Sequence, residues 1–160
     1  MKSQVDFGPR VPGSKAHEAC AIFLVNKLKS YSFDVIVQQG VVKTFDKKQF
    51  NLKNIIASIN PDAQKRILIS SHWDTRPWAD SDKQQKDKPI DGANDGASGV
   101  GVALELARQI NQQMPTVGID IIFFDLEDYG QPGGESETWC LGSQYWSSNL
   151  HKPGYFANFG

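Results

Sequence analysis

The sequence predicts an α/β domain of three layers, α/β/α, with a mixed, largely parallel central sheet. Two short segments, one beginning at Arg66 and the other spanning 117–124, are apolar on both faces, as strands between two layers of helices are. Between them, residues 96–112 carry apolar side chains at helical spacing on one side, and Val102 and Leu106 on the other. We therefore expect a largely buried helix that joins two parallel strands by a right-handed crossover.

The remaining elements are predicted from local patterns. Ser14 is a suitable N-cap for a helix over about residues 15–31. The valine-rich segment 33–45 and the alternating segment 50–59 flank a polar turn, which predicts an antiparallel pair of strands. Residues 139–149 predict a short helix near the end of the chain.

Composition bounds the class of protein. The 160 residues are 39% hydrophobic and 22% charged, which predicts one soluble globular domain over residues 1–160. A net charge of −1 without basic clusters argues against nucleic acid as the main partner. No apolar run reaches the roughly 20 residues of a membrane span. Cys20 and Cys140 lie far apart and predict free thiols. The compartment stays open, with export to the periplasm or the exterior as one alternative.

Residues that bind metals or move protons follow both apolar strands. His72 and Asp74 end the first strand, and Glu127 and Asp128 end the second; Asp95 precedes the intervening helix. Ligands of open α/β sheets bind beyond the carboxyl ends of the strands, so these side chains should meet. Each has an ordinary explanation taken singly, as a helix cap or a solvated loop acid. Their joint placement favours a zinc site with an acid left over as the base.

Three motifs in order carry a family resemblance: S-H-W-D, then G-A-N-D-G-A-S-G-V-G-V-A-L-E-L-A-R, then I-I-F-F-D-L-E-D. They resemble the zinc aminopeptidases that share a fold with the glutaminyl cyclases. The resemblance implies one or two zinc ions, with His72, Asp95 and Asp128 as metal ligands. It implies Glu127 as general base or proton shuttle, and Asp74 as the carboxylate that orients the histidine. It also makes the Asp95–Gly96 bond a candidate cis peptide.

The sequence departs from the family in two places. The acidic pair is Glu127-Asp128 where Glu-Glu is usual. Family members also continue beyond the final Y-F-A-N-F-G with a strand that carries an aspartate ligand, and later with a histidine ligand. The chain therefore resembles the N-terminal part of a longer enzyme, truncated at its C-terminus. Such a sheet would present an unpaired edge, which favours self-association.

Two reactions on peptide N-termini fit this resemblance. In an aminopeptidase, Glu127 would act as the base for water that attacks the first peptide bond. In a glutaminyl cyclase, it would shuttle a proton from the α-amine to the departing ammonia. The residues slightly favour hydrolysis, although S-E-T-W-C-L-G-S-Q-Y-W resembles the cyclases. Trp73 and Trp78 are candidates for the wall of the peptide pocket. A catalytically inactive domain that serves in binding or interaction is the alternative of another class.

Overall fold

The computed structural model describes all residues from 1 to 160. The elements, in chain order, are α1 (Lys2–Val5), α2 (Lys15–Lys29), β1 (Asp34–Lys43), β2 (Gln49–Ile59), β3 (Arg66–His72), α3 (Ala97–Gln112), β4 (Gly118–Phe124), the 3-10 helix η1 (Ser136–Thr138) and α4 (Leu141–Ser148).

Four strands form one mixed sheet in the order β1-β2-β4-β3. β1 pairs antiparallel with β2, and β2 pairs antiparallel with β4. β3 and β4 pair in parallel, joined by α3 as the sequence predicted. The α/β class and the mixed sheet are thus confirmed, with the parallel pairing confined to the two strands that carry the predicted site residues.

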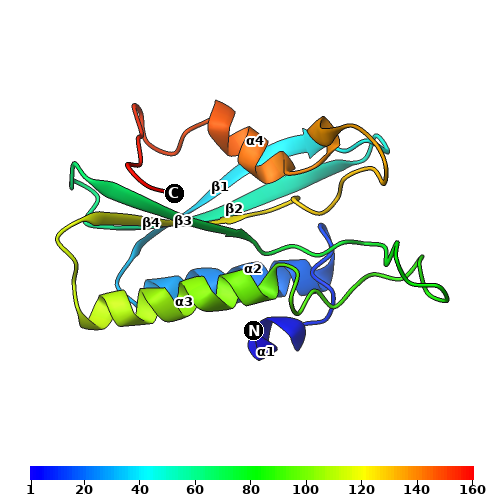
Figure 1. Ribbon diagram of the computed structural model, residues 1–160, viewed down its shortest axis with the longest axis horizontal. Coiled ribbons are helices and arrows are strands. Elements are labelled where there is room, and N and C mark those ends of the chain that lie inside the picture. Colours follow the sequence, from blue (N-terminus) through cyan, green and yellow to red (C-terminus); the bar gives the residue numbers. More distant parts are fainter.

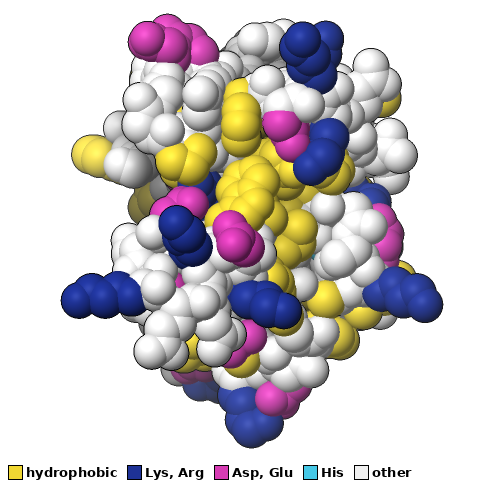
Figure 2. Space-filling model, turned by 90° about the vertical axis from the view of Figure 1, so that its right-hand side faces the viewer, with side chains coloured by type: hydrophobic (Ala, Val, Ile, Leu, Met, Phe, Trp, Pro, Cys, Tyr) yellow, Lys and Arg dark blue, Asp and Glu magenta, His cyan; other side chains and the backbone are white.

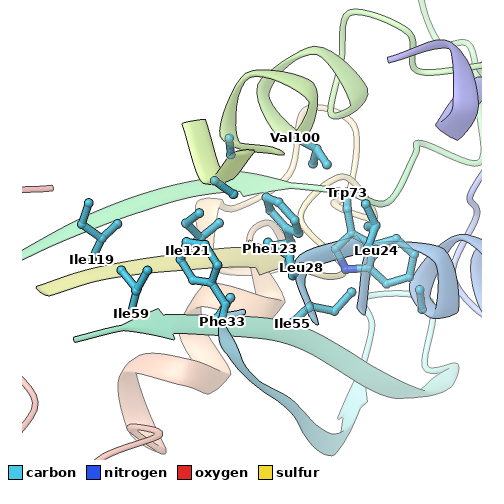
Figure 3. Close-up of a cluster of buried hydrophobic side chains, with 14 of the residues drawn as sticks. Leu24, Leu28, Phe33, Ile55, Ile59, Trp73, Val100, Ile119, Ile121 and Phe123 are labelled. Atoms are coloured by element: carbon cyan, nitrogen blue, oxygen red, sulfur yellow. The ribbon is translucent and has the colours of Figure 1, made fainter. Parts of the chain in front are cut away.

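The sheet lies between two layers (Figure 1). Helices α2 and α3 cover one face, and α4 with the C-terminal segment covers the other. The main core lies under α2 and α3, where Leu24 and Leu28 meet Ile121 and Phe123 of β4 (Figure 3). Burial of such aliphatic and aromatic side chains is the main source of folding free energy.

Helix α3 is less buried than expected. Its inner face supplies Val100, Ala103 and Ala107 to the core, whereas Val102 is 63% exposed and Leu106 is 40% exposed. Only one face of a helix can pack on a sheet, and no further layer covers the other face. The expectation of a largely buried helix was therefore wrong for this outer face.

Local signals positioned the first helix correctly. Ser14 adopts an extended backbone and its hydroxyl accepts a hydrogen bond from the backbone N–H of His17 at 3.1 Å. Both cysteines are free, as predicted. Burial raises the pKa of Cys20 to about 11, so this thiol stays neutral inside the core.

The outer edge of β3 is partly covered. The backbone N–H of Leu68 donates to the carbonyl of Phe159 at 2.8 Å, and the N–H of Asn158 donates to the carbonyl of Arg66 at 2.9 Å. Beyond this short contact, residues 69–72 have no strand neighbour on that side. None of the helices combines the length and apolar character needed to cross a bilayer.

Candidate active site

The predicted site residues converge at the carboxyl ends of β3 and β4. The His72 ring is the centre of the cluster: its Nε2 lies 2.8 Å from an oxygen of Asp95, and its Nδ1 lies 3.4 Å from Asp74. The same Nδ1 is 3.9 Å from a carboxylate oxygen of Glu127. Three chain segments that are distant in sequence therefore present their acids to one imidazole.

Asp74 connects the two strand ends. Its side chain is fully buried, and its two oxygens accept hydrogen bonds from the backbone N–H groups of Glu127 and Asp128, each at 3.2 Å. The carboxylate thus fixes the turn that presents the acidic pair while it faces the histidine ring. This geometry is that of a residue that positions other groups.

A glycine allows Asp95 to approach the histidine. Gly96 has a φ of +87°, and a Cβ at this position would lie 3.0 Å from the carbonyl oxygen of Asp74 and 3.2 Å from the ring of His72. Both the backbone conformation and the lack of space therefore require glycine. The Asp95–Gly96 bond is trans, like every other peptide bond in the chain, so the expected cis bond is not found.

Glu127 is held by a cysteine whose role no sequence pattern indicates. The Cys140 thiol donates to Oε1 of Glu127 at 3.2 Å, and the backbone N–H of Cys140 donates to the Glu127 carbonyl at 3.0 Å. Burial and this hydrogen bond raise the pKa of Cys140 to about 11, so the thiol keeps the proton that it donates. The Glu127 side chain remains 34% exposed, which leaves it accessible to a substrate.

The cluster carries an excess of negative charge. Burial lowers the pKa of His72, but the nearby carboxylates of Asp74, Glu127 and Asp95 outweigh this effect and raise it to about 9. Burial, followed by repulsion from the same acids, raises the pKa of Asp128 to about 7. Oxygen Oδ2 of Asp128 is buried without a hydrogen-bond partner. A cation at this position would relieve both the repulsion and the unpaired oxygen.

The donors match zinc in chemical type, since zinc accepts imidazole nitrogen and carboxylate oxygen. His72 and Asp95 are already in contact, and Asp128 is linked to them through Asp74. No group of three or more His, Cys, Asp or Glu side chains in the structure has the spacing of a metal site. The predicted ligands are thus gathered in one cluster, although their side chains do not form a coordination set.

Trp73 does not line a pocket. Its side chain is fully buried in the hydrophobic cluster (Figure 3). Its ring stacks on His17 at a centroid distance of 4.2 Å, and its Nε1–H donates to the carbonyl of Lys53 at 3.2 Å. Successive side chains of an extended segment point to opposite sides. Because His72 faces the site, Trp73 enters the core, and the prediction of a substrate contact was wrong.

Trp78 lies near the site and is half-buried. Its ring packs against Tyr129 at 5.2 Å, and it lines an open pocket of about 310 Å³ together with Phe45. The pocket lies where the loop of residues 75–90 projects, and the face at that end carries hydrophobic side chains between acidic and basic ones (Figure 2).

Arg76 joins the aromatic side chains to the acidic pair. Its guanidinium lies 5.4 Å from the ring centroid of Trp78 and 4.6 Å from that of Trp139. One of its N–H groups donates to the backbone carbonyl of Asp128 at 2.8 Å. The R-P-W order predicts a loop, and only the fold shows that this arginine lies close to the rings of two tryptophans.

Comparison with known proteins gives a consistent family. The model of Peptidase family M28 matches residues 54–159. A crystal structure of Bacteroides thetaiotaomicron glutaminyl cyclase bound to N-acetylhistamine is similar over 99% of this chain, with 53% identity and a TM-score of 0.96. A Zn-dependent exopeptidase from Parabacteroides distasonis gives 46% identity and a TM-score of 0.95 over 99% of this chain. A glutaminyl-peptide cyclotransferase of Drosophila melanogaster is 25% identical over 91% of this chain.

The chain is shorter than these relatives. It spans 40% of the Drosophila protein, 57% of the glutaminyl cyclase chain and 56% of the exopeptidase chain.

Proposed function

Because the chain belongs to peptidase family M28, we propose that it supplies part of the catalytic domain of a zinc-dependent enzyme acting on peptide N-termini, and that the reaction is cyclisation of N-terminal glutamine. The observation that carries the choice of reaction is the recurrence of glutaminyl cyclases among the similar proteins, from the curated Drosophila melanogaster and Bos taurus enzymes to the solved Bacteroides thetaiotaomicron structure. Identity alone does not separate the reactions, because a leucine aminopeptidase precursor of Bacteroides thetaiotaomicron is also 53% identical over 99% of this chain. The residues alone slightly favoured hydrolysis, and the recurrence of cyclases reverses the order.

The chemistry proposed for Glu127 follows from its surroundings. In the cyclisation, the α-amine of the substrate attacks the carbon of the side-chain amide, a ring C–N bond forms, and the bond to the amide nitrogen breaks. Glu127 accepts the proton that the amine loses and delivers it to the departing nitrogen, which leaves as ammonia. Its anchoring by Cys140 and by the backbone bonds to Asp74 supports this role, because a proton shuttle must be held in place.

His72, Asp95 and Asp128 are the proposed donors to zinc. Bound zinc would polarise the carbonyl of the scissile or cyclising amide. Asp74 holds the histidine and the acidic turn in position, and it is a positioning residue in this proposal. Trp78 and Phe45 are proposed to contact the substrate residue that follows the N-terminal one.

Aminopeptidase hydrolysis is the second candidate, and the likeness to a Zn-dependent exopeptidase favours it. In this reaction Glu127 would take a proton from water and pass it to the amine that leaves. The two reactions therefore use the same side chain and differ in the attacking group.

The test is incubation of the full-length protein with zinc, with a peptide that begins with glutamine and, separately, with a leucine anilide. We expect ammonia and a cyclised peptide from the first substrate and no anilide release from the second. If only the leucine anilide is turned over, the proposed reaction is hydrolysis and not cyclisation. Binding of zinc at micromolar concentration tests the alternative of a non-catalytic interaction domain, which predicts neither zinc binding nor turnover.

A further inference from the structure

A buried histidine and aspartate lie behind the site and take no part in the chemistry proposed above. Nε2 of His17 is 2.8 Å from Oδ1 of Asp125, and their side chains are 1% and 0% exposed. His17 comes from the first turn of α2, whereas Asp125 directly follows β4. A buried polar group without a hydrogen-bond partner costs folding free energy, so this hydrogen bond holds both side chains in place.

Asp125 organises the turn that presents the acidic pair. Besides His17, its carboxylate accepts the backbone N–H of Leu126 at 2.8 Å and that of Lys53 at 2.9 Å. Its own backbone N–H donates to the side chain of Asn54 at 3.0 Å. These bonds fix the end of β4 to β2 at the residue where the chain turns toward the site.

The turn itself is strained. Leu126, between Asp125 and Glu127, has a φ of +53°, although it is neither glycine nor asparagine. A non-glycine residue keeps this conformation only where surrounding contacts enforce it. The bond from its N–H to Asp125 is one such contact, and Leu126 is also fully buried. The direction in which Glu127 leaves the strand thus depends on the Asp125 carboxylate.

His17 also contacts the other strand end. Its ring stacks on Trp73 at 4.2 Å with an interplanar angle of 19°, and Trp73 lies between His72 and Asp74 in the chain. One imidazole therefore contacts the segments that present the histidine and the acidic pair. Its Nδ1 is buried without a partner, so Nε2 is the ring nitrogen that anchors His17, through Asp125.

We propose that His17 and Asp125 are positioning residues, which hold the ends of β3 and β4 in the register that Glu127, Asp128 and His72 need to act together. The proposal rests on the function proposed above and adds to it two residues that touch neither substrate nor metal.

Variants at position 17 separate the two contacts of the ring. His17→Phe keeps a ring for stacking on Trp73 and removes the hydrogen bond to Asp125. His17→Gln keeps a donor close to the position of Nε2 and removes the ring. Asp125→Asn places an NH₂ group against at least one of the three N–H donors that the carboxylate accepts. Leu28→Ala is the control, because Leu28 is a core residue on the same helix, about three turns away.

The measurements are zinc affinity by competition with a chelator, kcat and KM on the glutaminyl peptide, and the melting temperature, all on the full-length protein. We expect His17→Phe and Asp125→Asn to lose about 10-fold or more in zinc affinity and in kcat, the range seen for residues behind metal ligands. KM should change little, and His17→Gln should recover part of both losses. Leu28→Ala should lower the melting temperature at least as much and leave zinc affinity and kcat unchanged.

The proposal is overturned if His17→Phe and Asp125→Asn differ from Leu28→Ala only in melting temperature. It is also overturned if His17→Gln is no better than His17→Phe. A wild type that binds no zinc overturns both proposals. Failure of the proposed reaction alone looks different, because the wild type would then bind zinc without converting the glutaminyl peptide. In that case zinc affinity alone still decides whether the pair positions the site.

Discussion

Glu127 is the side chain on which the proposed chemistry depends most directly. It is partly exposed, it accepts the thiol hydrogen of Cys140, and its backbone is tied to Asp74. Replacing it by glutamine keeps the shape of the side chain but removes its ability to carry a proton. We expect kcat of Glu127→Gln to fall by a factor of about 10²–10⁴, which is the usual contribution of general acid–base catalysis. Zinc content and melting temperature should stay close to those of the wild type.

Glu135→Gln is the matched control for Glu127→Gln, since Glu135 is an exposed acid of the neighbouring loop. Activity assays and zinc analysis of both variants make the comparison. Wild-type turnover in Glu127→Gln would remove this residue from the mechanism.

Gly96 offers a second test at a single residue. Gly96→Ala would suffer from a positive φ and from contacts with His72 and Asp74, and we expect it to lose about 1–3 kcal/mol of unfolding free energy together with zinc affinity. Gly154→Ala is the control, because Gly154 also has a positive φ but has no atom within 4 Å of an added Cβ. Chemical denaturation measures the unfolding free energy, and chelator competition measures the zinc affinity. An equal loss of zinc affinity in Gly96→Ala and Gly154→Ala would show that the space around Gly96 is not needed for the site.

Some residues of the site could be predicted from the sequence, and others could not. His72, Asp95 and Glu127 could be predicted to converge because each lies at a chain reversal of one crossover unit. Cys140 and Arg76 could not, because their partners are set by the path of loops that follow no periodic pattern. Trp73 was misassigned since its neighbours belong to the site, whereas alternation turns its own side chain into the core.

Most helices and strands were predictable because their apolar periods are clear and their ends carry cap or turn residues. β1 and β2 form the expected antiparallel pair, and α3 joins β3 to β4 as expected. The order of the strands was not predictable, since insertion of β4 between β2 and β3 depends on contacts far apart in sequence. The exposure of Val102 and Leu106 was missed for a similar reason, because periodicity does not reveal how many layers surround a helix.

The start of α2 gives a prediction for an element. Ser14 satisfies the N–H of His17, which is also the residue proposed to position the site. Ser14→Ala should lower the unfolding free energy by about 1 kcal/mol, and Ser14→Asp should retain most of it, because both serine and aspartate accept this bond. Chemical denaturation measures the difference. Equal stability of Ser14→Ala and wild type would show that the cap contributes nothing.

The whole molecule presents an open strand edge beyond the short contact with Phe159. Because Leu68 directs its N–H outward, the alternation of the strand directs the N–H of Ser70 outward as well. We expect the chain of residues 1–160 to self-associate with concentration through this edge.

Ser70→Pro should weaken that association by removing an outward N–H, while Ser70→Ala keeps the N–H and should associate like wild type. Sedimentation at several concentrations distinguishes them. If the unmodified chain stays monomeric at every concentration, the open edge of β3 does not mediate self-association.

The proposed function depends above all on one zinc ion held where β3 and β4 end and α3 begins. The most direct measurement is the anomalous diffraction of zinc in crystals of the full-length protein. We predict a zinc peak with His72, Asp95 and Asp128 at bonding distances of about 2.0–2.2 Å. Crystals grown with zinc that show no peak in contact with any of these three side chains would contradict the account.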